Sequence, residues 1–213
     1  VGIAHLATLS DGTVFENPRA LKAAEHRLAH LQRSVARKRK GSANRRKAVM
    51  RLARLHYRIS CIRSDAIHKA SSAIAKRASV VGIESLNVSG MLKNHHIARS
   101  MSDAAPASLL RCIKYKVGWR GGRTYEADRF YASSKTCCRC GKVKVYLDLS
   151  ERIFRCECGN VIDRDLNAAI NLERMAASSA ATACGGDMSP RAEILPSDAA
   201  PSKQEPNTIE GRP

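Results

Sequence analysis

Four cysteines in the second half of the chain have the residue type and spacing of a metal site. Cys137 and Cys140 form a C-x2-C pair, fifteen residues follow, and Cys156 and Cys158 form a C-x-C pair. Two such pairs of thiolates bind structural zinc, and four sulfur ligands leave no position for a catalytic water. The one-residue gap of the second pair is shorter than usual. We expect these four residues to hold a structural zinc ion.

Cys138 lies between the two residues of the first pair and is the weaker candidate, because its use with Cys140 would leave a C-x-C pair on both sides. A module of this size has little hydrophobic core. Zinc would therefore supply much of its folding free energy, of order 10 kcal/mol. The other cysteines, Cys61, Cys112 and Cys184, are interpreted as thiols without a metal role.

Acidic residues at two other places could also do chemistry. Glu84 follows the apolar run 80–83, which is typical of a buried strand. The carboxyl ends of such strands are where α/β sheets bind ligands. A solvated or capping carboxylate is the alternative, and this segment alone favours it. Asp163 and Asp165 precede a predicted helix at 167–172, where helix capping is a sufficient account of Asp163.

Hydrophobic periodicity predicts the elements that position these residues. Asp11-Gly12 lies between two β-prone runs and predicts a hairpin over 1–16, and Asn17-Pro18 predicts a helix N-cap. Apolar residues at 3-4 spacing predict helices. We expect helices at 20–36, about 49–79 and 103–117, strands at 80–83 and 124–132, and a loop at 91–102. The aromatic residues Trp119, Tyr125, Phe130 and Tyr131 are assigned to the core, with base stacking as the alternative.

The charge of the chain is strongly one-signed. The net charge is +18, and between residues 19 and 79 eighteen Lys and Arg face two acids. Solvated faces usually mix signs, so this density favours contacts with a polyanion's phosphates over a merely solvated surface. The predicted nucleic-acid-binding residues surround the turn between the first two helices: Arg37, Lys38, Arg39, Lys40, Arg45, Arg46 and Lys47.

Length, hydropathy and composition indicate where in the cell the protein lies and how much of the chain is folded. The length of 213 residues suits one domain with an insertion. The sequence has neither a run of eighteen apolar residues nor the pattern of a signal peptide. We therefore expect no membrane partner and a cytoplasmic protein. Residues 176–213 are rich in Ala, Ser and Pro and are predicted to be a disordered tail.

Five motifs in order carry a family resemblance: LATLSDG, GIESLNVSGM, SSKTC-x2-CG, RCECG and DRDLNAAINL. Over about residues 1–175 the chain resembles the carboxyl-terminal half of the TnpB/OrfB family. These insertion-sequence-encoded proteins were long labelled transposases and are RNA-guided DNA nucleases related to type V CRISPR effectors. The resemblance implies an α/β fold of the RNase H-like, RuvC type with a helical-hairpin insertion and an inserted zinc ribbon. The implied parts are a core at 1–132 with the hairpin at about 18–79, a ribbon at 133–162 and a last core segment at 163–175.

The resemblance also implies a site and partners. The family holds two Mg²⁺ ions with three acids, and Glu84 matches the second and Asp165 the third, while the four cysteines match the zinc ligands. The partners implied are DNA and a guide RNA, and the location implied is the bacterial cytoplasm, with association to the nucleoid when the protein is bound to DNA. The family pattern places the first acid immediately before Val1, outside the sequence. We therefore expect the chain as given to bind nucleic acid and zinc with little or no cleavage. The alternative is a non-catalytic accessory protein or a decayed remnant.

Overall fold

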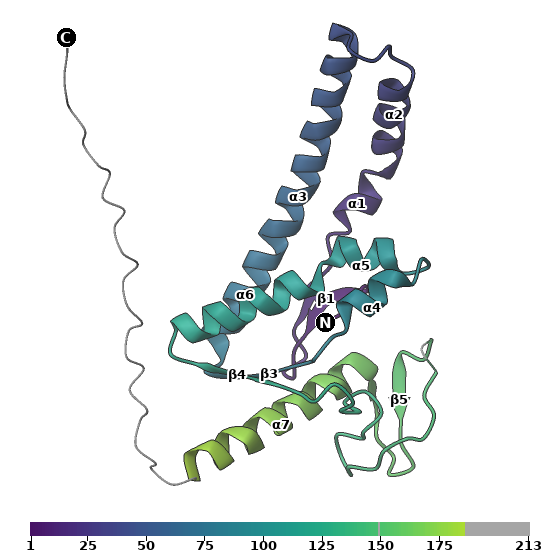
Figure 1. The fold of residues 1–213 in the computed structure, drawn as a ribbon. Coiled ribbons are helices and arrows are strands. Elements are labelled where there is room, and N and C mark those ends of the chain that lie inside the picture. Colours follow the sequence, from purple (N-terminus) through teal and green to yellow (C-terminus); the bar gives the residue numbers. More distant parts are fainter. Residues whose placement is uncertain (149, 186–213) are drawn as a thin grey trace, which may run out of the picture.

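The computed structural model describes residues 1–148 and 150–185, which form a mixed α/β fold (Figure 1). Its strands form three two-stranded sheets within this part of the chain. A long helical hairpin projects from the rest of the molecule, and a small cysteine-containing ribbon lies at the opposite end (Figure 1). None of the helices in the described residues is long and apolar enough to cross a membrane.

The chain begins with the predicted hairpin. β1 (His5–Thr8) pairs antiparallel with β2 (Val14–Glu16). Asp11 accepts a hydrogen bond from the amide of Thr13, and Gly12 has a φ of 82°, which a glycine adopts without strain. The Asp-Gly signal therefore identified the turn correctly.

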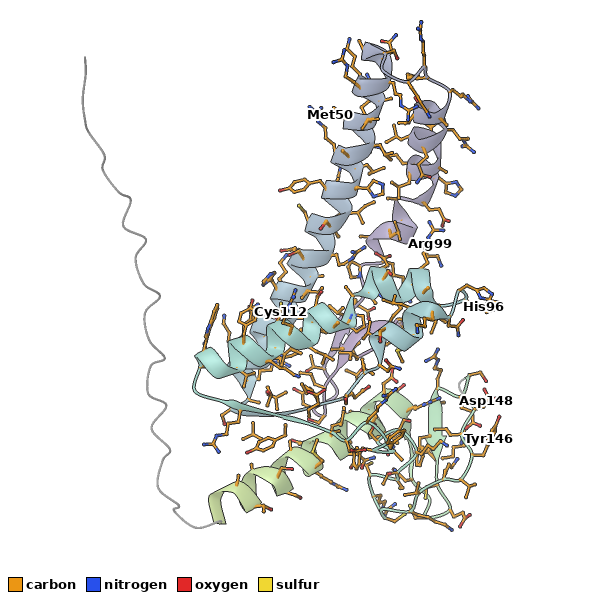
Figure 2. The ribbon with its side chains drawn as sticks, viewed as in Figure 1. Met50, His96, Arg99, Cys112, Tyr146 and Asp148 are labelled. Carbon is orange, nitrogen blue, oxygen red and sulfur yellow. The ribbon has the colours of Figure 1, made fainter. Side chains whose placement is uncertain are left out.

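A two-part helix and one long helix follow. The residues are α1 (Ala20–Ala23), α2 (Glu25–Ala36) and α3 (Ala43–Arg77). Leu28, Leu55 and Ile59 form the buried seam between the two arms. Met50 lies on the outer side of α3 and is 55% exposed (Figure 2). Most of the apolar stripe expected from the sequence is therefore the inner face, although Val49 and Ile62 of that stripe are exposed, and the charged residues cover the outside.

The predicted cap of the first helix is wrong. The side chain of Asn17 accepts from the amide of Arg19 and donates to the carbonyl of Ile3, so it closes a local turn. The cap is supplied by buried Asp103, which accepts from the amides of Leu21 and Lys22. A cap from 82 residues away has no local sequence signal.

The same carboxylate joins the hairpin to the body of the molecule. Asp103 forms an ion pair with Arg63 of α3, at 3.3 Å. It belongs to α5 (Ala98–Ala104), which follows α4 (Val88–Lys93). A second pair, Arg99 to Glu25 at 2.6 Å, lies at the same junction (Figure 2).

The predicted loop at 91–102 is thus wrong, because it contains parts of two helices. The side chain of Asn87 caps α4 by accepting from the amide of Gly90. Met101 is buried and anchors α5. These helices are short, and a polar segment of this length shows little apolar periodicity.

The main core lies where α3 meets α6 (Pro106–Trp119) and the parallel strands β3 (Val80–Ile83) and β4 (Arg123–Glu126). Leu109, Ile113 and Val117 are the most buried residues of α6, and they pack with Ile74 of α3. β3 was predicted correctly. β4 is shorter than the predicted strand at 124–132, because a turn centred on Asp128 follows it.

The last helix, α7 (Arg164–Gly185), is longer than expected. The predicted disordered tail was to begin at residue 176, but the helix continues for ten more residues. Alanine has the highest helix propensity, and Ala176 is buried at 1% exposure, so the segment gains both local and packing free energy. Residues 186–213 of the predicted tail lie outside the described residues.

The ribbon precedes α7. β5 (Ile153–Arg155) pairs antiparallel with β6 (Val161–Asp163), which leads directly into the helix. Its core is small and consists of Phe154, Leu147 and Cys137, with Cys156 and Ile162 packed against it.

Candidate functional site

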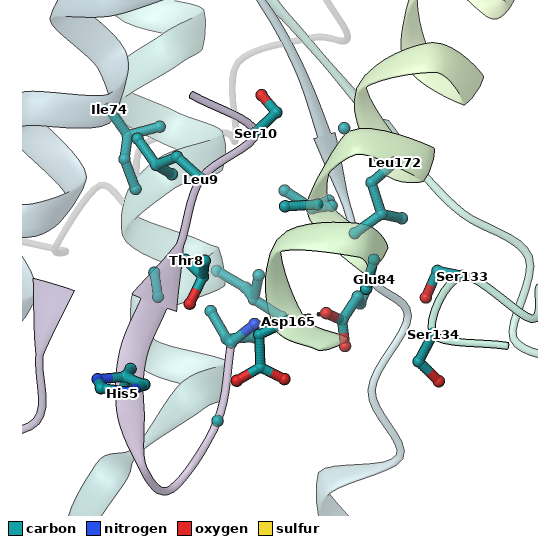
Figure 3. A pocket seen from close by; sticks show the side chains of 18 of the residues that line it. His5, Thr8, Leu9, Ser10, Ile74, Glu84, Ser133, Ser134, Asp165 and Leu172 are labelled. Carbon is teal, nitrogen blue, oxygen red and sulfur yellow. Dashed lines mark hydrogen bonds and ion pairs between the residues drawn. The ribbon is translucent and has the colours of Figure 1, made fainter. Parts of the chain in front are cut away.

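A pocket of about 750 Å³ lies between β1, the end of β3 and the start of α7. Both Glu84 and Asp165 line it. Figure 3 shows their carboxylates directed into the pocket from β3 and α7 respectively. Two acids 81 positions apart in the sequence are therefore brought to one concave site.

Glu84 follows β3, at the carboxyl end of the strand, as expected. Its side chain is 28% exposed, and one of its oxygens lies 3.4 Å from the terminal nitrogen of Val1. The strand places this carboxylate at the pocket wall and leaves it open to solvent on one side. A residue before Val1 would be attached at the atom that already contacts Glu84.

Asp165 lies in the first turn of α7, and its neighbour Asp163 explains why it is available. Asp163 accepts hydrogen bonds from the amides of Asp165 and Leu166, at 2.9 and 3.0 Å. It therefore caps the helix, as its position suggested. Asp165 remains exposed, with its carboxylate on the pocket side.

A close approach of backbones brings these two elements together. A Cβ atom on Gly82 would lie 2.2 Å from the carbonyl oxygen of Leu172 and 3.1 Å from the Cβ of Ala176. Only glycine allows β3 and α7 to lie this close. Gly82, two residues before Glu84, thus sets how closely α7 and its Asp165 approach the strand.

The four predicted cysteines form one cluster beside this site. The Sγ atoms of Cys137, Cys140, Cys156 and Cys158 all lie within 4.8 Å of one another. The Cys137–Cys158 and Cys140–Cys156 sulfur pairs are 3.7 and 3.6 Å apart. Zinc–sulfur bonds of about 2.3 Å in a tetrahedron place sulfurs about 3.8 Å apart, so the cluster fits a zinc ion.

The loops that carry the cysteines are similar despite their unequal spacing. The amide of Gly141 donates to the carbonyl of Cys137, and the amide of Gly159 donates to that of Cys156. Both glycines have a φ near +80°, at 77° and 82°. A tighter turn therefore delivers the C-x-C pair to the same cluster as the C-x2-C pair.

The electrostatics of the four thiols favour a cation. Burial raises the pKa of Cys137, but the backbone amides of Cys140 and Arg139 and the amide of Asn160 outweigh it and lower this pKa to about 6. The amide of Asn160 lowers the pKa of Cys158, whereas burial and the three neighbouring thiols raise it to about 12. One thiol of the cluster therefore deprotonates readily. Deprotonation of the others is unfavourable unless a positive charge lies nearby.

Cys138 lies outside this cluster. It is buried, and its amide donates to the side-chain oxygen of Asn167, at 2.9 Å. Sequence reasoning missed Asn167 and Asn171, which are 0% and 4% exposed. Asparagines four residues apart inside a helix are a signal that could have identified them, because asparagine is disfavoured there without a partner.

The seven predicted nucleic-acid-binding residues surround the turn between α2 and α3, at the far end of the hairpin from α7 (Figure 1). Five are exposed, and Lys38 and Arg45 are half-buried. No ion pair with a carboxylate involves any of the seven within the described residues. The structure gathers these residues at one tip but does not bring them to the pocket.

Three aromatic residues assigned to the core are instead on the surface. Trp119 is 81% exposed, Phe130 is 86% exposed and Tyr131 is 38% exposed. Trp119 ends α6 and contacts the ring of Tyr115 edge-on, with centroids 4.7 Å apart. None of the three belongs to a predicted helical stripe of apolar residues, which is why the default assignment was wrong.

Comparison with known proteins identifies relatives over nearly the whole chain. Residues 1–95 match the OrfB family model described as "Probable transposase", and residues 107–172 match the model "Cas12f1-like, TNB domain". The chain is 44% identical over 205 residues to a "Putative RNA-guided DNA endonuclease" of Streptomyces pristinaespiralis, which covers 96% of this chain and 50% of that protein. It is 37% identical over 224 residues to the "Putative RNA-guided DNA endonuclease InsQ" of Escherichia coli. This alignment covers 98% of this chain and 53% of the Escherichia coli protein.

A solved structure supports the fold. The fold of the chain is similar to that of a protein chain in the "Cas12f1-sgRNA-target DNA complex", with a TM-score of 0.53 and 18% sequence identity. The match covers 75% of this chain and 43% of the chain in the complex. The chain spans about half the length of the curated relatives it matches. The matched segments include the motifs around Glu84, the cysteines and Asp165. The chain therefore matches TnpB/OrfB proteins over nearly its whole length.

Proposed function

We propose that this chain is the nuclease part of a TnpB-type, RNA-guided DNA endonuclease with an RNase H-like core of the RuvC type. Residues 1–132 would form the first part of the core, with the hairpin at about 18–79 as an insertion. Residues 133–162 would form the zinc ribbon and residues 163–175 the last core segment. Support comes from the sequence similarity to TnpB/OrfB proteins and from the similarity of the fold to a chain of the Cas12f1 complex.

The observation that carries the proposal is the convergence of Glu84 and Asp165 on one pocket beside Val1. The family pattern places its first acid immediately before Val1. The terminal nitrogen of Val1 lies 3.4 Å from Glu84, so an acid at that position would start from the wall of the same pocket. Three carboxylates from three separate segments would then share one site.

The donor set suits magnesium. Mg²⁺ prefers oxygen ligands and is bound through one or two carboxylates together with waters and substrate phosphates. When two such ions are bound, they supply an activated water and a stabilised leaving oxygen for phosphodiester cleavage. Glu84 and Asp165 would hold the ions in this chain. Their partial exposure leaves room for a nucleic-acid strand.

The cysteine cluster would hold a structural zinc ion through Cys137, Cys140, Cys156 and Cys158. Four sulfur ligands close the coordination sphere, so the ion would stabilise the ribbon and take no part in cleavage. The sulfur–sulfur distances of 3.6 and 3.7 Å and the small apolar core support this assignment.

The hairpin would bind the phosphates of DNA or of the guide RNA. Its tip presents Arg37, Arg39, Lys40, Arg46 and Lys47 to solvent. Contacts of this kind fix the position of a nucleic acid without reading its sequence. Sequence choice would come from base pairing with the guide.

The acidic site can be tested by extending the chain by one residue. An aspartate placed before Val1 adds a carboxylate, and an asparagine placed there is the matched control, because both remove the ammonium group next to Glu84. We expect the aspartate form to bind Mn²⁺ more tightly than the asparagine form by roughly tenfold or more, measured by calorimetry. Glu84→Gln should remove this gain. Equal affinities of the two extended forms would refute the shared site.

A second test concerns the 213-residue chain without an added residue before Val1. Its Val1 ammonium lies beside Glu84 and competes with any metal ion there. We therefore expect no metal-dependent nicking of DNA by the 213-residue chain, which is the behaviour of a non-catalytic nucleic-acid-binding protein. Nicking that Glu84→Ala abolishes would contradict this expectation.

A further inference from the structure

Helix α7 has two faces with different partners. Asp165, Ala168, Ala169 and Leu172 line the pocket. Asn167, Asn171 and Arg174 repeat at 4-3 spacing on another face, roughly 140° around the helix at 3.6 residues per turn. One rigid element therefore carries both an acid of the candidate nuclease site and a row of polar side chains.

The polar row binds the backbone of the first cysteine loop. The side-chain oxygen of Asn167 accepts from the amide of Cys138, and its nitrogen donates to the carbonyl of Thr136, at 2.9 and 2.7 Å. The side-chain nitrogen of Asn171 donates to the carbonyls of Thr136 and Ser133, at 2.7 and 2.8 Å. Both asparagines are buried, so these bonds replace water and specify one arrangement of helix and loop.

Two arginines extend this attachment: Arg164 at the start of α7, which also lines the pocket, and Arg174 in the polar row. The guanidinium of Arg164 donates to the carbonyls of Asp148 and Glu151, at 2.8 and 3.3 Å. The guanidinium of Arg174 donates to the carbonyl of Cys138. The attached loop contains Cys137, whose sulfur belongs to the four-cysteine cluster.

We propose that Asn167 and Asn171 are positioning residues that transmit the zinc-bound shape of the first cysteine loop through α7 to Asp165. The inference rests on the proposed function in taking Asp165 as a magnesium ligand. Asn167 lies two residues from Asp165 on the same helix, so a shift of the loop moves both together. The opposite face of α7 is held close to β3 at Gly82, which leaves the helix little freedom to absorb such a shift.

The proposal predicts that zinc and manganese binding are coupled. In the chain extended with an aspartate before Val1, removal of zinc by a chelator should weaken Mn²⁺ binding by roughly tenfold, the effect of losing about two buried hydrogen bonds. Amide hydrogen exchange of residues 164–172 should become faster over the same titration, and this readout does not require Mn²⁺.

The deciding variant is Asn167→Leu/Asn171→Leu, which keeps the side-chain volume and removes the hydrogen bonds. It should still contain zinc by elemental analysis, while residues 164–172 exchange fast with or without zinc and Mn²⁺ affinity no longer responds to the chelator. Ser178→Ala, an exposed change on the same helix, is the control and should respond like the parent chain.

Two results would overturn the inference. One is exchange of residues 164–172 that is the same with and without zinc in the parent chain. The other is a double variant that retains the full response to the chelator. If exchange responds to zinc but Mn²⁺ does not bind, the positioning role stands and the proposed magnesium site fails, so the two proposals are separable.

Discussion

The helical hairpin and the unit formed by the ribbon and α7 are built on opposite principles. The hairpin is held by a repeated apolar seam of Leu28, Leu55 and Ile59, and its charges cover the outside without carboxylate partners at the tip. The ribbon has a small core, and a few specific atoms hold it: four sulfurs and the buried amides of Asn167 and Asn171.

This difference separates two kinds of function. Phosphate binding by the hairpin is spread over many equivalent side chains, so each contributes a similar small share. Geometry at the pocket depends on single atoms in the ribbon and α7, so one substitution can remove it. Changes in the two regions should therefore differ in size and in what they affect.

The largest expected effect is loss of a zinc ligand. Cys140→Ser replaces a thiolate with a hydroxyl, and the ribbon would lose most of a metal contribution of order 10 kcal/mol. We expect zinc content to fall below one ion per chain, and residues 133–163 to lose protection from hydrogen exchange. α3 should keep its protection, because its seam does not involve the ribbon. Unfolding of α3 along with the ribbon would break the comparison.

A smaller but still large effect is expected from salt on the hairpin. If six or more phosphates are contacted, affinity for DNA or RNA should fall roughly a thousandfold or more between about 50 and 200 mM salt. Arg46→Gln should reduce the salt slope by about one unit and leave sequence preference unchanged. Fluorescence anisotropy at several salt concentrations measures both. A flat response would mean that the exposed charges do not contact phosphates.

Next in size is the packing of α7 on β3. Gly82→Ala places a Cβ 2.2 Å from the carbonyl oxygen of Leu172, so the helix must move. We expect a loss of about 1–3 kcal/mol in unfolding free energy, as in other overpacked sites, together with weaker Mn²⁺ binding. Gly118→Ala is the matched control, since a Cβ there meets open space in α6 and should be neutral or stabilising. Denaturant unfolding of both variants checks this prediction.

The smallest effect is expected for a charge pair in the ribbon. Lys142 contacts Glu157 at 2.5 Å, and this hydrogen bond lowers the pKa of the Glu157 carboxyl. A carboxyl whose pKa is lowered in the folded state stabilises it above its unfolded pKa near 4.5, and this stabilisation is lost as the pH falls. Because both groups are exposed, Glu157→Gln should change thermal stability at pH 7 only slightly. A large change would show that charges contribute to the ribbon alongside the metal.

The sequence predicts the periodic parts of this fold and the ligand types of its sites. The hairpin, β3 and the four cysteines follow from local spacing. What local patterns could not predict depends on long-range contacts: the capping of α1 by Asp103, and the extension of α7, which Ala176 stabilises by packing near Gly82. The same limit applies to Glu84. Its local sequence does not distinguish a solvated carboxylate from a site residue, because the distinction depends on the helix that faces it.

Asp103 has a consequence for the order of events during synthesis. The hairpin leaves the ribosome before α5, and the seam of α2 and α3 can form as soon as residue 77 has emerged. The amides of Leu21 and Lys22 stay uncapped until Asp103 follows. Domains fold from the amino terminus as the chain grows, so the base of the hairpin should be the late step in this half of the molecule. One carboxylate then fixes the direction in which the arm projects.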